Sequence, residues 1–444
     1  MPATPFDSAH LSSLFPTGSI GALFSDSAEI RAMMLVEAAL AEAQAAHGVI
    51  PQDAATAIRR AAHEAQIDPA ALAQATGQNG VSVPGLVAAM RAAIPDAHAA
   101  QYLHWGATSQ DIQDSGLMLR LARAVALQRE TLAAFLAVLA DLAETEAETP
   151  MVARTYGQAA VPTSFGARVC NWGRPLLQLY ASPPKALLSL SGAAGTGSQL
   201  GTDPVALRSA MAQKLGLTVA DYSWHVDRSQ VLGFAQWFAE IARILGKFGD
   251  DVILSVQSGV AEITITNAGA SSTMPQKQNP VAASAIVALA RHAIGLQATL
   301  MGAGMPRQER DGAAWFTEWL ALPQLVLSSA AALEQGTALA GAIAPNRDAM
   351  RAGLDADGGA ALAETLSFAL ARHMPRPEAQ AAIKAAAADT REKGGTLAEN
   401  ARARFPDLPA GVFDTAHSLG TAPADARSFA RAVRALLAKP DTAV

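Results

Sequence analysis

The feature that most constrains this sequence is a long interval without proline, since none occurs between Pro204 and Pro275. Proline removes a backbone donor and breaks the interior of a helix, so this interval permits helices well beyond roughly 8–20 residues. The pattern predicts long helices over residues 111–148, 228–263 and 280–301. The third is expected to begin at Pro280 with Asn279 as its cap. Long helices joined by loops are typical of an elongated bundle.

Composition supports a largely helical chain with more than one domain. Half of the residues are hydrophobic, and Ala-rich runs with Leu, Glu and Arg favour helix. Only 16% are charged, so much of the helix surface is expected to face other protein, as in an oligomer. We predict an all-α fold with an N-terminal helical domain, a central long-helix bundle domain and a small C-terminal helical domain, at residues 1–110, 111–346 and 347–444.

Several classes of protein are excluded by composition and motifs. The net charge is −6 and no block is dense in Lys or Arg, which argues against a nucleic-acid partner. The single cysteine, Cys170, forbids an intrachain disulfide and fits a reducing compartment. Neither a basic signal segment nor a membrane span is recognised, so a cytoplasmic protein is expected. No metal or cofactor motif is present, and we predict neither.

Two polar loops interrupt the helical pattern in the first half of the chain. In "HWGATSQDIQDS" (residues 104–115), Thr108 and Asp111 have the spacing of a capping box. The same loop could equally cradle a carboxylate, because Thr108 and Ser109 stand at a helix N-terminus. His104, just upstream, is either a core histidine or a functional group. In "ARTYGQAAVPTSFG" (residues 153–166), the polar residues taken alone are ordinary loop residues.

A third loop, "GASSTMPQKQNP" (residues 269–280), carries a lysine between two prolines. By itself it would be a flexible surface loop with a solvated Lys277. Together the three loops resemble the fumarase/aspartase superfamily. Residues 271–280 match every fixed position of its signature S-S-x-M-P-x-K-x-N-P, and residues 106–111 and 154–162 match its segments G-x-T-S-x-D and R-T-x-x-Q-x-A-x-P.

The resemblance covers essentially the whole chain and implies a fold and a site. The fold is a three-domain, all-α chain whose long central helices form a common bundle in a homotetramer. Each active site is then built from the three loops of three different subunits. Ser271 is implied as the general base on a mobile loop, with Lys277 and His104 as further catalytic candidates. The implied substrate-binding residues are Thr108, Ser109, Arg154, Thr155, Tyr156, Gln158, Ser272, Met274, Asn279 and Arg310.

One departure from the family pattern narrows the activity. Members that expel an amine carry a histidine, taken as the general acid, where this chain has Tyr156. An amine must be protonated to leave, whereas a carboxylate, with a conjugate acid of pKa about 4, needs no such help. The chain is accordingly most similar to bacterial 3-carboxy-cis,cis-muconate cycloisomerases, in which a substrate carboxylate adds to a double bond of the same tricarboxylate. Those enzymes form 4-carboxymuconolactone in protocatechuate (β-ketoadipate) degradation.

Three alternatives stay open at the level of sequence. Tyr156 either shapes the pocket or donates a proton. The enzyme could instead be a carbon–nitrogen lyase similar to adenylosuccinate lyase, with Tyr156 or His104 as its acid. A non-catalytic relative of the crystallin type is disfavoured by the intact signature at residues 271–280.

Overall fold

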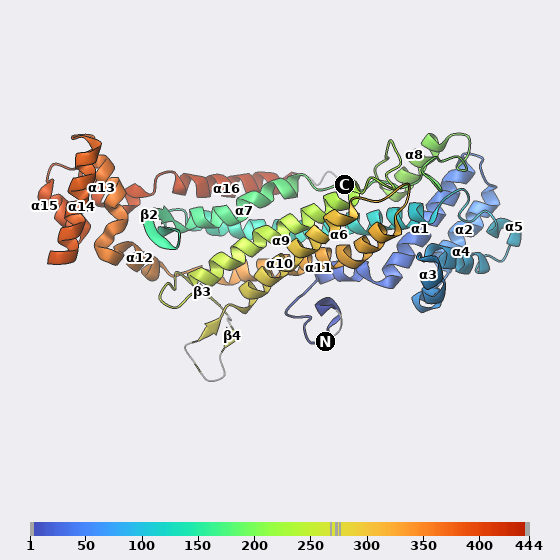
Figure 1. Ribbon diagram of the computed structural model, residues 1–444, viewed down its shortest axis with the longest axis horizontal. Coiled ribbons are helices and arrows are strands. Elements are labelled where there is room, and N and C mark those ends of the chain that lie inside the picture. Colours follow the sequence, from blue (N-terminus) through green and yellow to red (C-terminus); the bar gives the residue numbers. More distant parts are fainter. Residues whose placement is uncertain (1–3, 267–268, 271–273, 275–276, 440–444) are drawn as a thin grey trace.

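The computed structural model describes residues 4–439, apart from 267–268, 271–273 and 275–276. Figure 1 shows an elongated molecule whose middle is a bundle of long helices, which confirms the predicted all-α fold. The bundle consists of α6 (Ser109–Thr145), α7 (Phe165–Ala181), α9 (Ser229–Ser255), α10 (Val281–Ala303) and α11 (Gly312–Ala342). One continuous hydrophobic core runs through it, with Phe135 and Phe248 in edge-to-face contact between α6 and α9.

The long helices agree with the sequence patterns, apart from their ends. The capping box of Thr108 and Asp111 is present at the start of α6. Asn279 is not the cap of α10, and that prediction was wrong. Asn279 pairs with Gly269 in a short antiparallel ladder, and Pro280 takes the cap position without a side-chain hydrogen bond. Because its backbone is held in this ladder, Asn279 belongs to a strand end and not to the helix.

Shorter helices cover the two ends of the bundle (Figure 1). One end holds α1 (Asp26–Ala46), α2 (Gln52–Glu64), η3 (Pro69–Leu72), α3 (Ala73–Asn79), α4 (Val83–Ala92), α5 (Ala97–Ala100) and α8 (Pro204–Leu215). The N-terminal turns η1 (Pro5–Asp7) and η2 (Gly18–Phe24) lie along the side of the bundle, where η2 packs on α6 and α11. The other end holds α12 (Arg347–Gly359), η4 (Ala360–Leu362), α13 (Ala363–Leu370), α14 (Arg376–Lys393), α15 (Leu397–Arg404), η5 (Ala410–Phe413) and η6 (Thr415–Ser418). A separate small core lies among residues 362–408.

The last helix, α16 (Ala422–Leu437), returns along the bundle and packs on α6 and α7. Phe429 lies against Gly173 of α7, where an added Cβ would come within 2.3 Å of the ring. The C-terminal range 347–444 therefore contains both a small independent core and a helix that belongs to the packing of the bundle. The boundaries between the three domains stay predictions.

The strands are short and serve as ties between helices. β1 (Pro150–Thr155) and β2 (Gln158–Ser164) form an antiparallel hairpin between α6 and α7. β3 (Ile263–Ile265) pairs with β6 (Ile343–Pro345), which joins the chain after α9 to the end of α11. β4 (Gly269–Ala270) and β5 (Gln278–Asn279) form a short antiparallel ladder that projects from the bundle in Figure 1.

Helix α10 resembles a membrane span in length and composition, the one such helix in the described part of the chain. It packs on α9 and α11 along one side. Its other side exposes a mixture of apolar and small residues, including Ile294 and Met301. This pattern fits a helix of a protein core with one uncovered face.

A buried ion cluster joins three helices of the bundle. Arg228, at the N-cap of α9, donates to both oxygens of Asp114 in α6 at 2.8 and 3.0 Å. It also donates to both oxygens of Glu318 in α11, each at 2.7 Å. All three side chains are at most 3% exposed. Burial raises the pKa of Glu318, although Arg228 acts against this change.

Replacing Arg228 by Met should leave Asp114 and Glu318 buried without a counter-charge. Breaking a buried ion pair from one side costs about 3–5 kcal/mol, so Arg228→Met should lower the free energy of unfolding by that amount in urea denaturation. Arg243→Met is the matched control because Arg243 pairs with Glu240 on the helix surface, where such pairs contribute at most about 1 kcal/mol. Equal effects of the two substitutions would contradict the role given to Arg228.

Candidate active site

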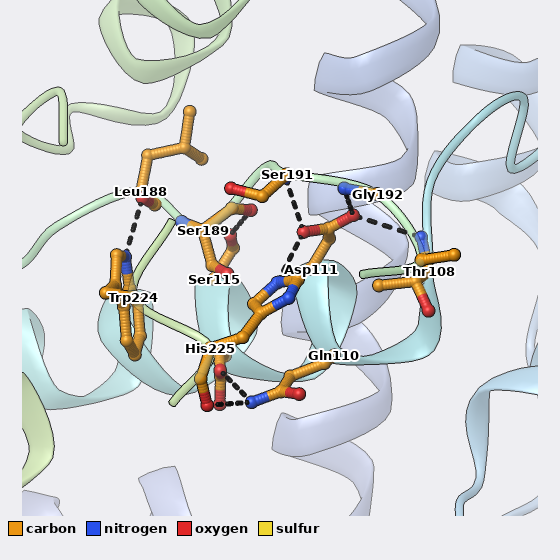
Figure 2. A network of polar contacts seen from close by, with 12 residues as sticks. Thr108, Gln110, Asp111, Ser115, Leu188, Ser189, Ser191, Gly192, Trp224 and His225 are labelled. Carbon is orange, nitrogen blue, oxygen red and sulfur yellow. Dashed lines mark hydrogen bonds and ion pairs between the residues drawn. The ribbon is translucent and has the colours of Figure 1, made fainter. Parts of the chain in front are cut away.

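The N-terminus of α6 is organised around one buried carboxylate, that of Asp111 (Figure 2). Its Oδ1 accepts from the backbone N–H of Ser191 at 2.7 Å and lies 2.8 Å from Nε2 of His225. Its Oδ2 accepts from the backbone N–H of Gly192 at 2.9 Å and of Thr108 at 3.0 Å. Each oxygen therefore has two partners, which is how a buried carboxylate is normally stabilised.

Residues 188–192 pass over the first turns of α6 and are fixed there by further hydrogen bonds (Figure 2). Ser115 donates to the carbonyl of Ser189 at 2.8 Å and accepts from its N–H at 3.1 Å. The indole of Trp224 donates to the carbonyl of Leu188 at 2.9 Å. The loop before α6 is equally close, because a Cβ on Gly106 (φ +71°) would lie 2.2 Å from the carbonyl oxygen of Gln199. Only glycine fits at position 106.

Arg310 comes to this helix N-terminus from the segment before α11. Its guanidinium donates to Oγ1 of Thr108 at 3.0 Å, to Oε1 of Gln110 at 3.1 Å and to the carbonyl of Ala193 at 3.2 Å. The structure thus brings together Thr108 and Arg310, which sequence reasoning grouped only through the resemblance. Ser109 follows as the first residue of α6. A guanidinium beside the positive end of a helix dipole favours an anion at this place.

His104 lies in the same loop, in the left-handed region at φ +65°. Its Nδ1 is 2.6 Å from Oε1 of Glu37, a side chain of α1 with no exposed surface. Burial by itself lowers the pKa of His104. The charge and hydrogen bond of Glu37 and the charge of Asp111 outweigh burial and an opposing Arg91, so the pKa is raised above its usual value. The ring is therefore more readily cationic than a free histidine.

The second predicted loop, residues 153–166, forms most of the β1–β2 hairpin at the far end of α6. Tyr156 (φ +51°) and Gly157 (φ +74°) form the turn, and Tyr156 is fully exposed. Thr155 and Gln158 are exposed beside it. Arg154 donates to both oxygens of the buried Glu262 at 2.8 and 2.9 Å.

A cavity of about 740 Å³ opens next to this hairpin. Its lining carries both signs of charge: Arg154, Arg168, Lys247, Asp251 and Glu262. Lys247 and Asp251 form an ion pair across one turn of α9. The hairpin side of the candidate site is thus a polar cavity in which Arg154 and Arg168 both pair with the carboxylate of Glu262.

The third predicted loop is described only in part. Ser271 and Ser272 lie outside the described residues. Lys277 is exposed and donates its backbone N–H to the carbonyl of Met274 at 3.0 Å. Met274 is also exposed, and Asn279 is half-buried at the base of the β4–β5 hairpin. Among the described residues, no group of three or more His, Cys, Asp and Glu is placed to hold a metal ion.

The first two loops do not meet within one chain. They are separated by α6, which has 37 residues and, at about 1.5 Å per residue, spans roughly 55 Å. Thr108 stands at one end of this helix, and the β1–β2 hairpin follows its other end. A common site can form from these loops only if they come from different chains.

Sequence reasoning missed three partners of the first loop. Glu37 had a visible signal, since it is the one charged residue between Arg31 and Glu42 in an apolar helical run. Nothing in the sequence paired His225 or the loop at residues 188–192 with Asp111. They reach Asp111 from positions some 80 to 114 residues away along the chain.

Asp111→Asn tests the role of this carboxylate. An amide nitrogen would replace one oxygen and face at least one backbone N–H donor. This should lower the free energy of opening of the loop at residues 188–192 by about 1–3 kcal/mol. We expect faster hydrogen exchange at the backbone amides of Ser191 and Gly192. Asp203→Asn, at the exposed N-cap of α8, is the matched control, because asparagine caps about as well as aspartate. Unchanged exchange at both amides in Asp111→Asn would contradict the assignment.

Comparison with known proteins places the chain in a family. The sequence profile of a lyase family matches residues 16–295. A 3-carboxy-cis,cis-muconate cycloisomerase from Pseudomonas aeruginosa is 38% identical over 425 residues, covering 92% of this chain and 93% of that protein. A nitrosuccinate lyase from Streptomyces davaonensis is 35% identical over 417 residues, covering 89% of this chain and 87% of that protein.

Solved structures agree. The 3-carboxy-cis,cis-muconate lactonizing enzyme of Pseudomonas putida has a TM-score of 0.90 at 31% identity, covering 96% of this chain and 99% of that one. A fumarate lyase from a Mesorhizobium species has a TM-score of 0.85 at 29% identity, covering 93% and 97%. By sequence profile, relatives and fold, the chain belongs to the lyase family of the fumarase/aspartase superfamily.

Proposed function

We propose that this protein is a 3-carboxy-cis,cis-muconate cycloisomerase. The observation that carries the proposal is the similarity to cycloisomerases of that name over nearly the whole chain. The geometry supports it, because Arg310 and the N-terminus of α6 together provide a positively charged binding site for a substrate carboxylate. The turn that holds the acid histidine in amine-expelling relatives carries Tyr156. The pathway, protocatechuate degradation in the cytoplasm, is part of the same proposal.

The assembly we propose is a homotetramer with sites shared between three subunits. The roughly 55 Å length of α6 keeps the first and second loops apart in one chain. The uncovered apolar residues of the bundle are consistent with further helices packing on it, among them Leu254 of α9 and Ile294 and Met301 of α10.

The reaction would begin with binding of the tricarboxylate. Thr108, Ser109 and Arg310 hold one carboxylate at the start of α6, while Lys277 and Asn279 from another subunit hold a second. Arg154, Thr155 and Gln158 complete the pocket, with Ser272 and Met274 on the loop. Because Arg154 is already paired with Glu262, Arg310 supplies more of the charge that the substrate meets.

In the bond-forming step, a substrate carboxylate oxygen adds to the distal double bond of the same molecule. A carbon–oxygen bond forms, and the π electrons move into the conjugated carboxylate to give an enediolate. Fixed donors and Lys277 stabilise this charge, and tethering the reactants removes on the order of 7–11 kcal/mol from the barrier. Ser271 delivers a proton to carbon and is reprotonated from solvent. Tyr156 shapes the pocket.

A second candidate is an elimination that expels a weakly basic anion. The similarity to a nitrosuccinate lyase favours it, since release of nitrite also needs no general acid. Both reactions fit a site in which Tyr156 replaces histidine.

Purified enzyme should convert 3-carboxy-cis,cis-muconate, with loss of the diene absorbance in the ultraviolet. Nitrosuccinate, followed by nitrite release, and adenylosuccinate, followed by its ultraviolet spectrum, should react slowly or not at all. Nitrosuccinate lacks the third carboxylate that the proposed pocket binds. Adenylosuccinate expels an amine, which the proposed site has no histidine to protonate. If nitrosuccinate or adenylosuccinate were turned over faster than 3-carboxy-cis,cis-muconate, the proposed activity would be wrong and the enzyme would catalyse that elimination.

Arg310→Met should raise KM for the tricarboxylate about tenfold or more, since a hydrogen bond to a charged group contributes about 1.5–3 kcal/mol. Steady-state kinetics at fixed ionic strength measures the change. Arg307→Met is the control, because Arg307 is exposed and pairs with Asp311. Equal KM values for the two variants would show that Arg310 does not bind the substrate.

A further inference from the structure

A buried carboxylate of α1 faces the loop before α6, and the reaction scheme above does not use it. Glu37 has no exposed side-chain surface and stands among apolar residues of α1 such as Val36 and Ala38. Its Oε1 lies 2.6 Å from Nδ1 of His104. Its Oε2 has no hydrogen-bond partner among the described residues.

This arrangement lowers the stability of the fold, so a purely structural role does not explain it. A buried carboxylate oxygen without a partner bears a desolvation penalty, and an apolar residue would pack better in this helix face. His104 adds backbone strain, because its φ of +65° is unfavourable for a residue with a side chain. Strained residues of this kind cluster at active sites and ligand-binding sites.

We propose that Glu37 is a positioning residue of the substrate site. Its carboxylate fixes the His104 ring through Nδ1 and supplies the counter-charge, so that the Nε2–H can donate to a carboxylate bound at the start of α6. His104 and Arg310 then flank the same helix N-terminus with two cations. The inference rests on the proposed function only in requiring a polycarboxylate substrate.

The charged groups that face His104 define the direction of the pH dependence. Glu37 of α1 and Asp111 of α6 favour the cationic ring, whereas Arg91 of α4 opposes it. Below the raised pKa the ring is an imidazolium and attracts carboxylates. As the pH rises through that pKa, the charge and its contribution to binding are lost. Removing the negative charge of Glu37 should move this loss to lower pH.

The test uses the full-length enzyme and Glu37→Gln, which keeps size and shape. Binding of tricarballylate, a tricarboxylate that cannot lactonise, is measured by calorimetry across neutral pH, and the ring of His104 is titrated by NMR. We expect both the decline in affinity and the ring titration to shift to lower pH. KM for the substrate should rise about tenfold or more, as for loss of a charged hydrogen bond, with a smaller change in kcat.

Gln44→Met is the matched control for a purely structural role. Gln44 is also buried in α1 and donates to the carbonyl of Trp105 in the same loop, at 2.7 Å. It should lower Tm without moving either titration. If Glu37→Gln leaves both titrations where they are in the unaltered enzyme, the proposal is wrong.

His104→Gln provides a second route if Glu37→Gln does not fold. A glutamine amide can still donate to Glu37, but it does not titrate, so the decline in tricarballylate affinity should disappear. Persistence of that decline would overturn the proposal. Because tricarballylate binding and the NMR titration do not depend on turnover, absence of lactonisation would reject the proposed function without deciding this inference.

Discussion

The candidate site depends on a single buried charge, the carboxylate of Asp111. Two backbone amides from residues 191–192, one from the start of α6 and the ring of His225 all converge on it. This one group therefore fixes the direction of the longest helix relative to the loop that covers its N-terminus. Thr108 and Arg310 meet within that arrangement, at the helix end where we propose that a substrate carboxylate binds.

The same helix also determines how far apart the functional loops lie. A site at the beginning of α6 and a hairpin after its end cannot approach each other without bending a helix whose core side is fully packed. The long helices therefore hold each loop in a fixed position, but they keep the first and second loops of one chain too far apart to meet. In the single chain, one face of α10 is exposed and the polar cavity beside Arg154 is open.

Local patterns predicted the helical class and the capping box, because both depend on residues close together in sequence. They failed where tertiary pairing decides, since Asn279 is held in a ladder with Gly269 and does not cap α10. The resemblance identified Arg310, but not its hydrogen bond to Thr108 across 202 positions. Glu37 could have been noticed as an isolated charge, whereas its partner His104 is brought to it only by folding.

The length of α6 has a genetic consequence. If each site draws on several chains, a chain defective at the start of α6 and another defective in the β1–β2 hairpin can together form mixed oligomers in which some sites contain neither defect. Two alleles that are each inactive alone would then restore part of the activity when expressed in one cell. Alleles with both lesions in the same loop would not.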